Sequence, residues 1–332
     1  MGMFLVRRLV NYLVLVVVAT TCAYLLAASA LSPRVNYENQ SPRPTEAAVD
    51  ARLDELNLND KTPLAERWMV WAGDVVTGDF GKTVTGSSVN DQIEVRILVS
   101  LRLIVAGVVI GATLGVAVGA YAAVKQYGWF DQASTAAAFL VLAVPAVVIA
   151  ISLQVVAIWL NGLMSEAFGI PQFFVFNGER TPGLETGFLG TVWDRFKHMV
   201  LPTIALALGQ FAAFSRYQRN MMLDVLGSDF VRTARAKGLT RRSALLKHAL
   251  RTALIPTVTY FTFTFGVMMA GTTFTEKIYN WKGMGSWLID SIATQDVHAV
   301  AAVSCFMAVC VMAAAFLSDI LYAWLDPRVR VS

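Results

Sequence analysis

Acidic and amide side chains in apolar stretches are the first candidates for chemistry in this sequence. Glu276 and Asp319 are acids in or beside such stretches, and Gln154 and Gln210 lie inside them. In a membrane, such groups line a pathway or bond a neighbouring helix, so these two roles are expected. Glu276 could meet a cationic amino group or simply be solvated, and Asp319 could contact a substrate, pack helices or snorkel to the membrane surface.

Two other patterns fall short of a metal, catalytic or nucleotide site. His198, His248 and His298 are separated in the chain and fall on different sides of the predicted membrane, so they form no cluster. Gly78-Asp-Phe-Gly-Lys-Thr83 resembles the end of a phosphate-binding loop, but Val76 stands where that loop needs glycine and no buried strand precedes it. A plain turn is therefore predicted, with no metal or cofactor bound by this chain.

The segment from Ser228 to Pro256 is the long basic stretch among the apolar ones, and it is predicted to form two short helices. Ser228 and Asp229 can cap a helix that runs to Lys237. Asp229 would lie at the positive end of the helix dipole and Arg235 and Lys237 at the negative end, which is the favourable arrangement. Gly238 can stop that helix in a left-handed conformation, and Thr240 can cap a second helix, Arg241 to Leu250. From the residues alone, this basic surface would contact anionic lipid.

The elements that position these residues belong to a membrane protein. The 332 residues are 56% hydrophobic and only 15% charged, whereas about a quarter of the residues in soluble domains are charged. The net charge of +4 does not indicate nucleic-acid binding, because the apolar blocks exclude a soluble basic domain. Cys22, Cys305 and Cys310 lie in apolar runs and predict no disulfide framework. We expect an all-α polytopic membrane protein.

Six apolar stretches are long enough to cross a bilayer core of roughly 30 Å. The first could be a signal peptide, because Ala-Ala-Ser-Ala at 27–30 resembles a cleavage site, but its length favours an uncleaved helix. The predicted spans are 11–31, 99–124, 133–160, 199–217, 253–275 and 298–324.

Small residues and a proline mark two of these spans. Gly107, Gly111, Gly115 and Gly119 recur every four residues and form a smooth stripe on one helical face. The stripe would let another helix pack closely, either statically or as a sliding contact in a moving transporter. Pro145 is expected to bend the third span, which is tolerable where neighbours or cavity water satisfy the freed carbonyl.

The distribution of Lys and Arg predicts the orientation of the chain. Bases cluster after the fourth span and flank both termini, which places these parts in the cytoplasm and the loops 32–97, 161–197 and 276–297 outside. In the first outer loop, short helices are expected at Thr45 to Leu56, after Thr62-Pro63, and at Ser88 to Ile97. The predicted regions are 1–31 with the first helix, 32–98 outside, a core of 99–325 containing the basic loop 220–252, and a cytoplasmic tail, 326–332.

The basic segment resembles the EAA loop of bacterial ABC importer permeases, in the form of the oligopeptide/dipeptide/nickel branch. Arg232-Thr-Ala-Arg-Ala-Lys-Gly238-Leu239 carries the resemblance, with Arg232-Thr233-Ala234 in place of the generic Glu-Ala-Ala. Gly78-Asp79-Phe80-Gly81, His198 to Pro202 and Gly283-Met-Gly285 are similar to other motifs of that branch, so the resemblance covers most of the chain. Lys282 and Asp296-Val297-His298 depart from the branch's pattern.

The resemblance implies a type I ABC importer permease fold and a role without enzymatic activity of its own. ATP and Mg would be bound by two cytoplasmic ATPase subunits, and a C-type permease and an extracytoplasmic peptide-binding protein would complete the assembly in the inner membrane. A peptide would be the substrate. The implied coupling helix and elbow consist of Asp229, Arg232, Thr233, Ala234, Arg235, Ala236, Lys237, Gly238 and Leu239.

Several alternatives remain open at this point. A nickel or glutathione importer of the same branch would carry the same loop. A secondary transporter would work without ATPases and usually shows inverted repeats or intramembrane ionisable pairs, neither of which is evident here. An intramembrane serine protease is a remote alternative, because Gly283-Met-Gly-Ser286 misses the Gly-x-Ser spacing at residue 284.

Overall fold

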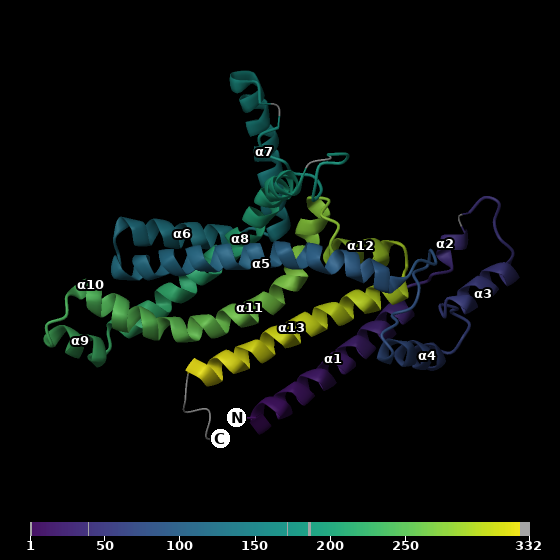
Figure 1. Ribbon diagram of the computed structural model, residues 1–332, viewed down its shortest axis with the longest axis horizontal. Helices are drawn as coiled ribbons and strands as arrows, with labels where there is room; N and C mark the ends of the chain where they lie inside the picture. Colours follow the sequence, from purple (N-terminus) through teal and green to yellow (C-terminus); the bar gives the residue numbers. More distant parts are fainter. Residues whose placement is uncertain (1, 39, 171, 185–186, 326–332) are drawn as a thin grey trace. The chain divides into compact units, whose positions relative to one another are not determined.

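The computed structural model describes residues 2–38, 40–170, 172–184 and 187–325, and these residues form helices joined by turns (Figure 1). The only β-type pairing among them is an isolated bridge between Lys82 and Ser88. The helices are α1 (Gly2–Ala30), α2 (Val35–Glu38), α3 (Glu46–Glu55), α4 (Leu64–Val76), α5 (Val89–Val124), α6 (Trp129–Ala143), α7 (Ala146–Phe168), α8 (Phe188–Leu226), α9 (Asp229–Ala236), α10 (Arg241–Ala244), the π-helix η1 (Leu245–Leu250), α11 (Arg251–Ile278), α12 (Met284–Ala293) and α13 (Val297–Leu325).

Five of the described helices are long and apolar enough to cross a membrane: α1, α5, α7, α8 and α13. The segments His248–Gly266 and Gly271–Ile278 meet at a bend of 56° and give a sixth span when they are counted as one. The prediction of an all-α polytopic membrane protein is therefore confirmed, with five to six spans. The tail at 326–332 lies outside the described residues.

The third span differs from the prediction of one bent helix across 133–160. Its first part, α6, ends at Ala143, and α7 begins at Ala146, so that Val144 and Pro145 separate two helices. Val144 is extended, with ψ of 129°, because a residue that precedes proline is disfavoured in the helical region. The proline therefore starts α7 instead of bending one continuous helix.

The second span also differs, because α5 is longer than expected. A separate short helix was expected at Ser88 to Ile97, but α5 runs without interruption from Val89 to Val124. The sequence between these residues contains no proline, so nothing forces the chain out of the helix where the outer loop ends and the span begins.

The described residues divide into two compact units, Met1–Leu101 with Trp281–Ala313 and Arg102–Asn280 with Ala314–Ser332. In the first unit, Tyr24 and Trp71 stack with ring centroids 4.5 Å apart and are almost fully buried with Leu53. The expected short helices are present there: Thr45 caps α3 by accepting a hydrogen bond from Ala48 N (3.3 Å), and α4 follows Pro63.

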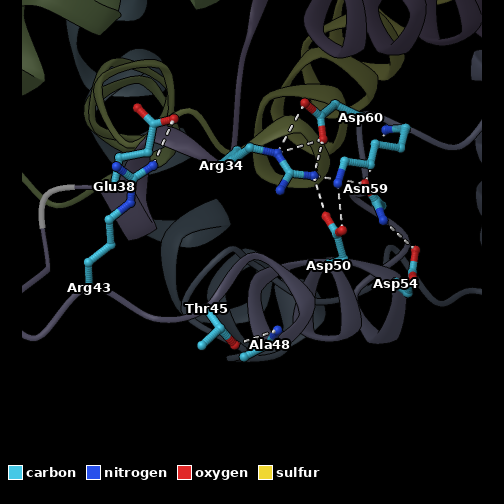
Figure 2. Close-up of polar contacts among 10 residues, drawn as sticks. Arg34, Glu38, Arg43, Thr45, Ala48, Asp50, Asp54, Asn59 and Asp60 are labelled. Carbon is cyan, nitrogen blue, oxygen red and sulfur yellow. Dashed lines mark hydrogen bonds and ion pairs between the residues drawn. The ribbon is translucent and has the colours of Figure 1, made fainter.

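A charged cluster ties the end of the first long helix to α3 and to the turn after it (Figure 2). The Arg34 guanidinium points between two carboxylates and donates to Asp50 Oδ1 (2.7 Å), Asp60 Oδ1 (2.6 Å) and Asn59 Oδ1 (3.1 Å). Asn59 in turn donates to Asp54 Oδ1 (2.8 Å). The hydrogen bonds from Arg34 hold the pKa of Asp60 below its ordinary value, since they favour the charged carboxylate.

The segment that resembles a phosphate-binding loop is a turn, as predicted. Gly78 and Gly81 both have positive φ, and the Asn90 side chain closes the turn by donating to Gly78 O (2.7 Å) and accepting from Phe80 N (3.0 Å). His298 is buried beside Gly81 and its Nδ1 donates to Lys82 O (2.9 Å). The turn is thus part of the packing of the first unit.

Candidate coupling and pathway sites

The basic segment of the second unit forms the predicted helix and glycine elbow. Helix α9 begins at Asp229 and ends at Ala236, one residue before the predicted end. Gly238 has φ of +90°, a conformation that costs glycine little and other residues much more. Leu239 N donates to Ala234 O (3.3 Å), so the chain reverses immediately after the helix. The prediction that Gly238 stops this helix is confirmed.

Helix α9 has one buried face and one exposed face. Val231 and Ala234 are buried, and Val231 packs with Ala123, Met222 and Ala249. The opposite side exposes Asp229, Phe230, Arg232, Thr233 and Ala236, and Lys237 directly after the helix is exposed as well. Arg235 belongs to the helix, but its side chain lies outside the described part of the chain. No described residue covers this face, so it is accessible to another protein.

The second arm of the segment is a short α-helix that continues as a π-helix. Thr240 Oγ1 accepts a hydrogen bond from Ser243 N (3.3 Å), which confirms the predicted cap. Helix α10 ends at Ala244, and Leu245–Leu250 form η1, so the prediction of an α-helix to Leu250 is wrong for its last part. Sequence periodicity did not reveal the π-helix, because one wider turn hardly changes which residues share a face.

A cavity of about 550 Å³ lies between this segment and the turn that joins α5 to α6. Its lining includes Ala123 and Val124 at the end of α5, Gly128 of the turn, Leu226 at the end of α8, and Val231 and Leu245 of the basic segment. Figure 1 shows α9 and α10 beside that turn. The basic segment therefore rests on the ends of α5, α6 and α8.

The four glycines of α5 face α8 at very short range. A Cβ at Gly111 would lie 2.5 Å from Ala207 O, and one at Gly115 would lie 2.7 Å from Phe211 O. Gly107 meets the Leu206 side chain in the same way, and Gly119 meets Ser215 O. Any side chain at these positions would collide with α8, so the two backbones approach each other as closely as the glycines allow.

The four residues expected along a pathway belong to four different helices, α7, α8, α11 and α13. Gln154 Nε2 donates to the backbone carbonyls of Ile278 (2.9 Å) and Phe176 (3.3 Å), so its amide joins α7 to the end of α11 and to the loop after α7. Gln210 lies beside Gly111, and its Oε1 is buried without a partner among the described residues. Glu276 is fully buried and Asp319 is half-buried.

Pairing of two residues far apart in the chain is the main feature that sequence reasoning missed. Asp131 at the start of α6 accepts two hydrogen bonds from Arg219 of α8, at 2.5 Å and 2.8 Å. Asp194 similarly accepts from Thr181 N (2.8 Å) and Thr181 Oγ1 (2.7 Å), which fixes the loop before α8. A separation of 88 residues between Asp131 and Arg219 leaves no periodic signal in the sequence.

The structure also bears on two kinds of site that the sequence raised, a serine nucleophile at Ser286 and a metal site. Ser286 is buried and its hydroxyl donates to Gly283 O (3.0 Å), so this contact gives no support to a nucleophilic role. Among the described residues, no three His, Cys, Asp or Glu side chains lie close enough to hold a metal ion.

The fold and the helix-elbow segment define an α-helical membrane protein with one amphipathic helix exposed beside its spans. Residues 115–331 match the family model described as binding-protein-dependent transport system inner membrane component. The chain belongs to this family, the permeases of ABC import systems, and it is a multi-pass protein of the inner membrane.

Relatives in the family are similar over nearly their whole length. The oligopeptide transport system permease protein OppB of Mycobacterium tuberculosis is 48% identical over 332 residues, which is 100% of both chains. The dipeptide transport system permease protein DppB of Bacillus subtilis is 31% identical over 100% of this chain and 99% of its own. The glutathione transport system permease protein GsiC of Shigella flexneri is 32% identical over 85% of this chain and 86% of its own.

Proposed function

We propose that this chain is the permease subunit of an ATP-driven peptide importer and forms half of its translocation pathway. The observation that carries the proposal is α9, an exposed amphipathic helix that ends in the left-handed Gly238 and is buried along one face only. Full-length similarity to a chain named as an oligopeptide permease supports peptide as the substrate class. Glutathione, itself a peptide, is the nearest alternative, since GsiC is also similar.

The proposed assembly contains four further subunits. A C-type permease would form the other half of the pathway, two ATPase subunits would bind ATP and Mg²⁺, and a binding protein would deliver peptide from outside. Both termini and the basic segment would be cytoplasmic, because their Lys and Arg residues favour that side. This chain would bind lipid and peptide, but neither nucleotide nor nucleic acid.

The exposed face of α9 is the proposed contact with an ATPase subunit. Arg232 and Lys237 present positive charge, and Asp229 lies at the positive end of the helix dipole. When the ATPases close on ATP, α9 would be carried with them, and the rigid support under Val231 would pass the displacement to α5, α6 and α8. The spans would then change between inward-facing and outward-facing states. The four glycines of α5, Pro145, Gln154, Gln210, Glu276 and Asp319 are proposed gating or pathway positions.

Replacing the elbow glycine tests this proposal. In Gly238→Pro, proline fixes φ near −65°, whereas the elbow needs +90°, so α9 should point elsewhere. We expect the complete transporter to lose peptide uptake while the chain remains in the membrane. Reversing the charges of Arg235 and Lys237 should give the same result. Co-purification of the ATPases and uptake of labelled peptide are the measurements, and survival of both in these variants would exclude α9 as the coupling helix.

A further inference from the structure

The ion pair between Asp131 and Arg219 is buried at the end of the spans nearest to the basic segment. Asp131 is only 2% exposed, and its two oxygens accept from Nε and Nη2 of Arg219. This bidentate geometry fixes both the distance and the orientation of the two helices. A carboxylate removed from water in this way needs its partner, because Asp131 alone would be an uncompensated buried charge, whereas the Arg219 side chain is 21% exposed.

The same carboxylate also holds the turn between α5 and α6. Tyr127 N donates to Asp131 Oδ2 (2.9 Å), and Tyr127 has φ of +63°, which is unusual for a residue with a large side chain. Gln132 Nε2 closes the turn further by donating to Tyr127 O (3.0 Å). Asp131 therefore connects three elements: the turn, the start of α6 and α8.

Arg219 lies where α5 touches α8 and shortly before α8 leads into α9. A Cβ at Gly119 would lie 3.0 Å from Arg219 N, so α5 is in backbone contact with α8 at this residue. Helix α8 ends at Leu226, about two turns later. Between them, Met222 packs against Val231 of α9. The end of α8 thus joins the support of α9 directly to the Asp131–Arg219 pair.

We propose that Asp131 and Arg219 are positioning residues for energy coupling, which fasten the α5–α6 turn to α8 so that these helices follow α9 as one body. Without the pair, α8 could move while the turn stayed behind, and displacement of α9 would be absorbed locally. The inference rests on the proposed function of α9. It predicts that the pair sets how much peptide moves for each ATP, and not whether the ATPases bind.

The test uses the complete transporter in liposomes, with its ATPases, partner permease and binding protein. Asp131→Asn and Arg219→Gln should retain ATP hydrolysis but import about tenfold less peptide per ATP, since residues along a coupling network typically change coupling by this order. The charge-swapped double variant, Asp131→Arg with Arg219→Asp, restores the ion pair but not the acceptor for Tyr127 N, so it should recover only a small part of that loss. Lys125→Gln removes an exposed charge from the same turn and should leave the ratio unchanged.

Each outcome separates this inference from the proposed function. If Asp131→Asn and Arg219→Gln import as much peptide per ATP as the unchanged protein while Gly238→Pro abolishes uptake, the pair has no coupling role and the proposed function stands. If the unchanged chain recruits no ATPase, the proposed function itself fails. If the two variants do not assemble, Arg219→Lys decides: it keeps the charge but not the two-point contact, and unchanged peptide import per ATP would overturn the inference.

Discussion

At the scale of single residues, glycines determine how closely two of the helices pack. The glycines of α5 replace side-chain packing with contact between backbones, whereas Gly162 of α7 has no atom within 4 Å of where a Cβ would lie. Both are glycines in helices of similar composition, so their neighbours alone distinguish their roles.

Gly111→Ala should destabilise the second unit by about 1–3 kcal/mol, because the new methyl group would lie 2.5 Å from Ala207 O and force the helices apart. Gly162→Ala is the matched control and should be neutral or slightly stabilising, since alanine favours the helix over glycine. Thermal unfolding of the two purified variants in the same detergent would measure the difference. Equal midpoints would contradict the close contact between α5 and α8.

At the scale of elements, the charged cluster around Arg34 shows how polar contacts add to the core around Tyr24 and Trp71 in the first unit. Two carboxylates and one amide converge on a single guanidinium, and α3 and the turn after it depend on that residue (Figure 2). Arg43 and Glu38 form a longer and more exposed pair, at 4.0 Å, which should contribute little.

Acid should loosen α3. Arg34 lowers the pKa of Asp60, and Lys61 followed by Arg34 lowers that of Asp50. A depressed carboxyl pKa contributes stability above its ordinary value of about 4, and the contribution is lost as pH falls through the folded-state pKa. The protection of the α3 amides, measured as the exchange rate relative to the intrinsic rate at each pH, should therefore fall below about pH 4. Arg34→Gln should show fast exchange already at neutral pH, and Arg43→Gln should behave as the unchanged protein. Protection of α3 that stays constant across this pH range in the unchanged chain would argue against the cluster.

At the scale of the whole molecule, a permease of this family acts within an assembly, so its activity is a property of several chains. Reconstitution with the partner subunits should give ATP hydrolysis that rises when a peptide-loaded binding protein is added. Peptides of different length, glutathione and nickel should be compared at equal concentration. Stimulation by nickel alone would contradict peptide as the substrate class, while stimulation by glutathione alone would identify the alternative.

The sequence predicted the fold class, the positions of most spans and the glycine elbow, because these depend on local composition and on φ at one residue. The predictions failed where the result depends on whether a helix continues without a break, or on contacts between residues far apart in the sequence. The extension of α5 to Val89 and the break before Pro145 follow from local geometry that hydropathy does not report. The Asp131–Arg219 pair is formed only when α6 packs along α8. Roles of Gln154, Gln210, Glu276 and Asp319 stay predictions.

The π-helix η1 has a consequence for insertions and deletions in the basic segment. A π turn holds one residue more than the α turn that it replaces, so η1 contains a built-in insertion between α10 and α11. Deleting one residue from 245–250 should return the turn to α geometry, because the wider turn already absorbs the extra residue and the helices on either side keep nearly the same direction. Such a deletion should leave α9 aimed as before, whereas deleting one residue from α11, where no wide turn absorbs the change, should rotate everything before it by about 100° about the helix axis. Chain register after the π-helix is therefore a determinant of coupling.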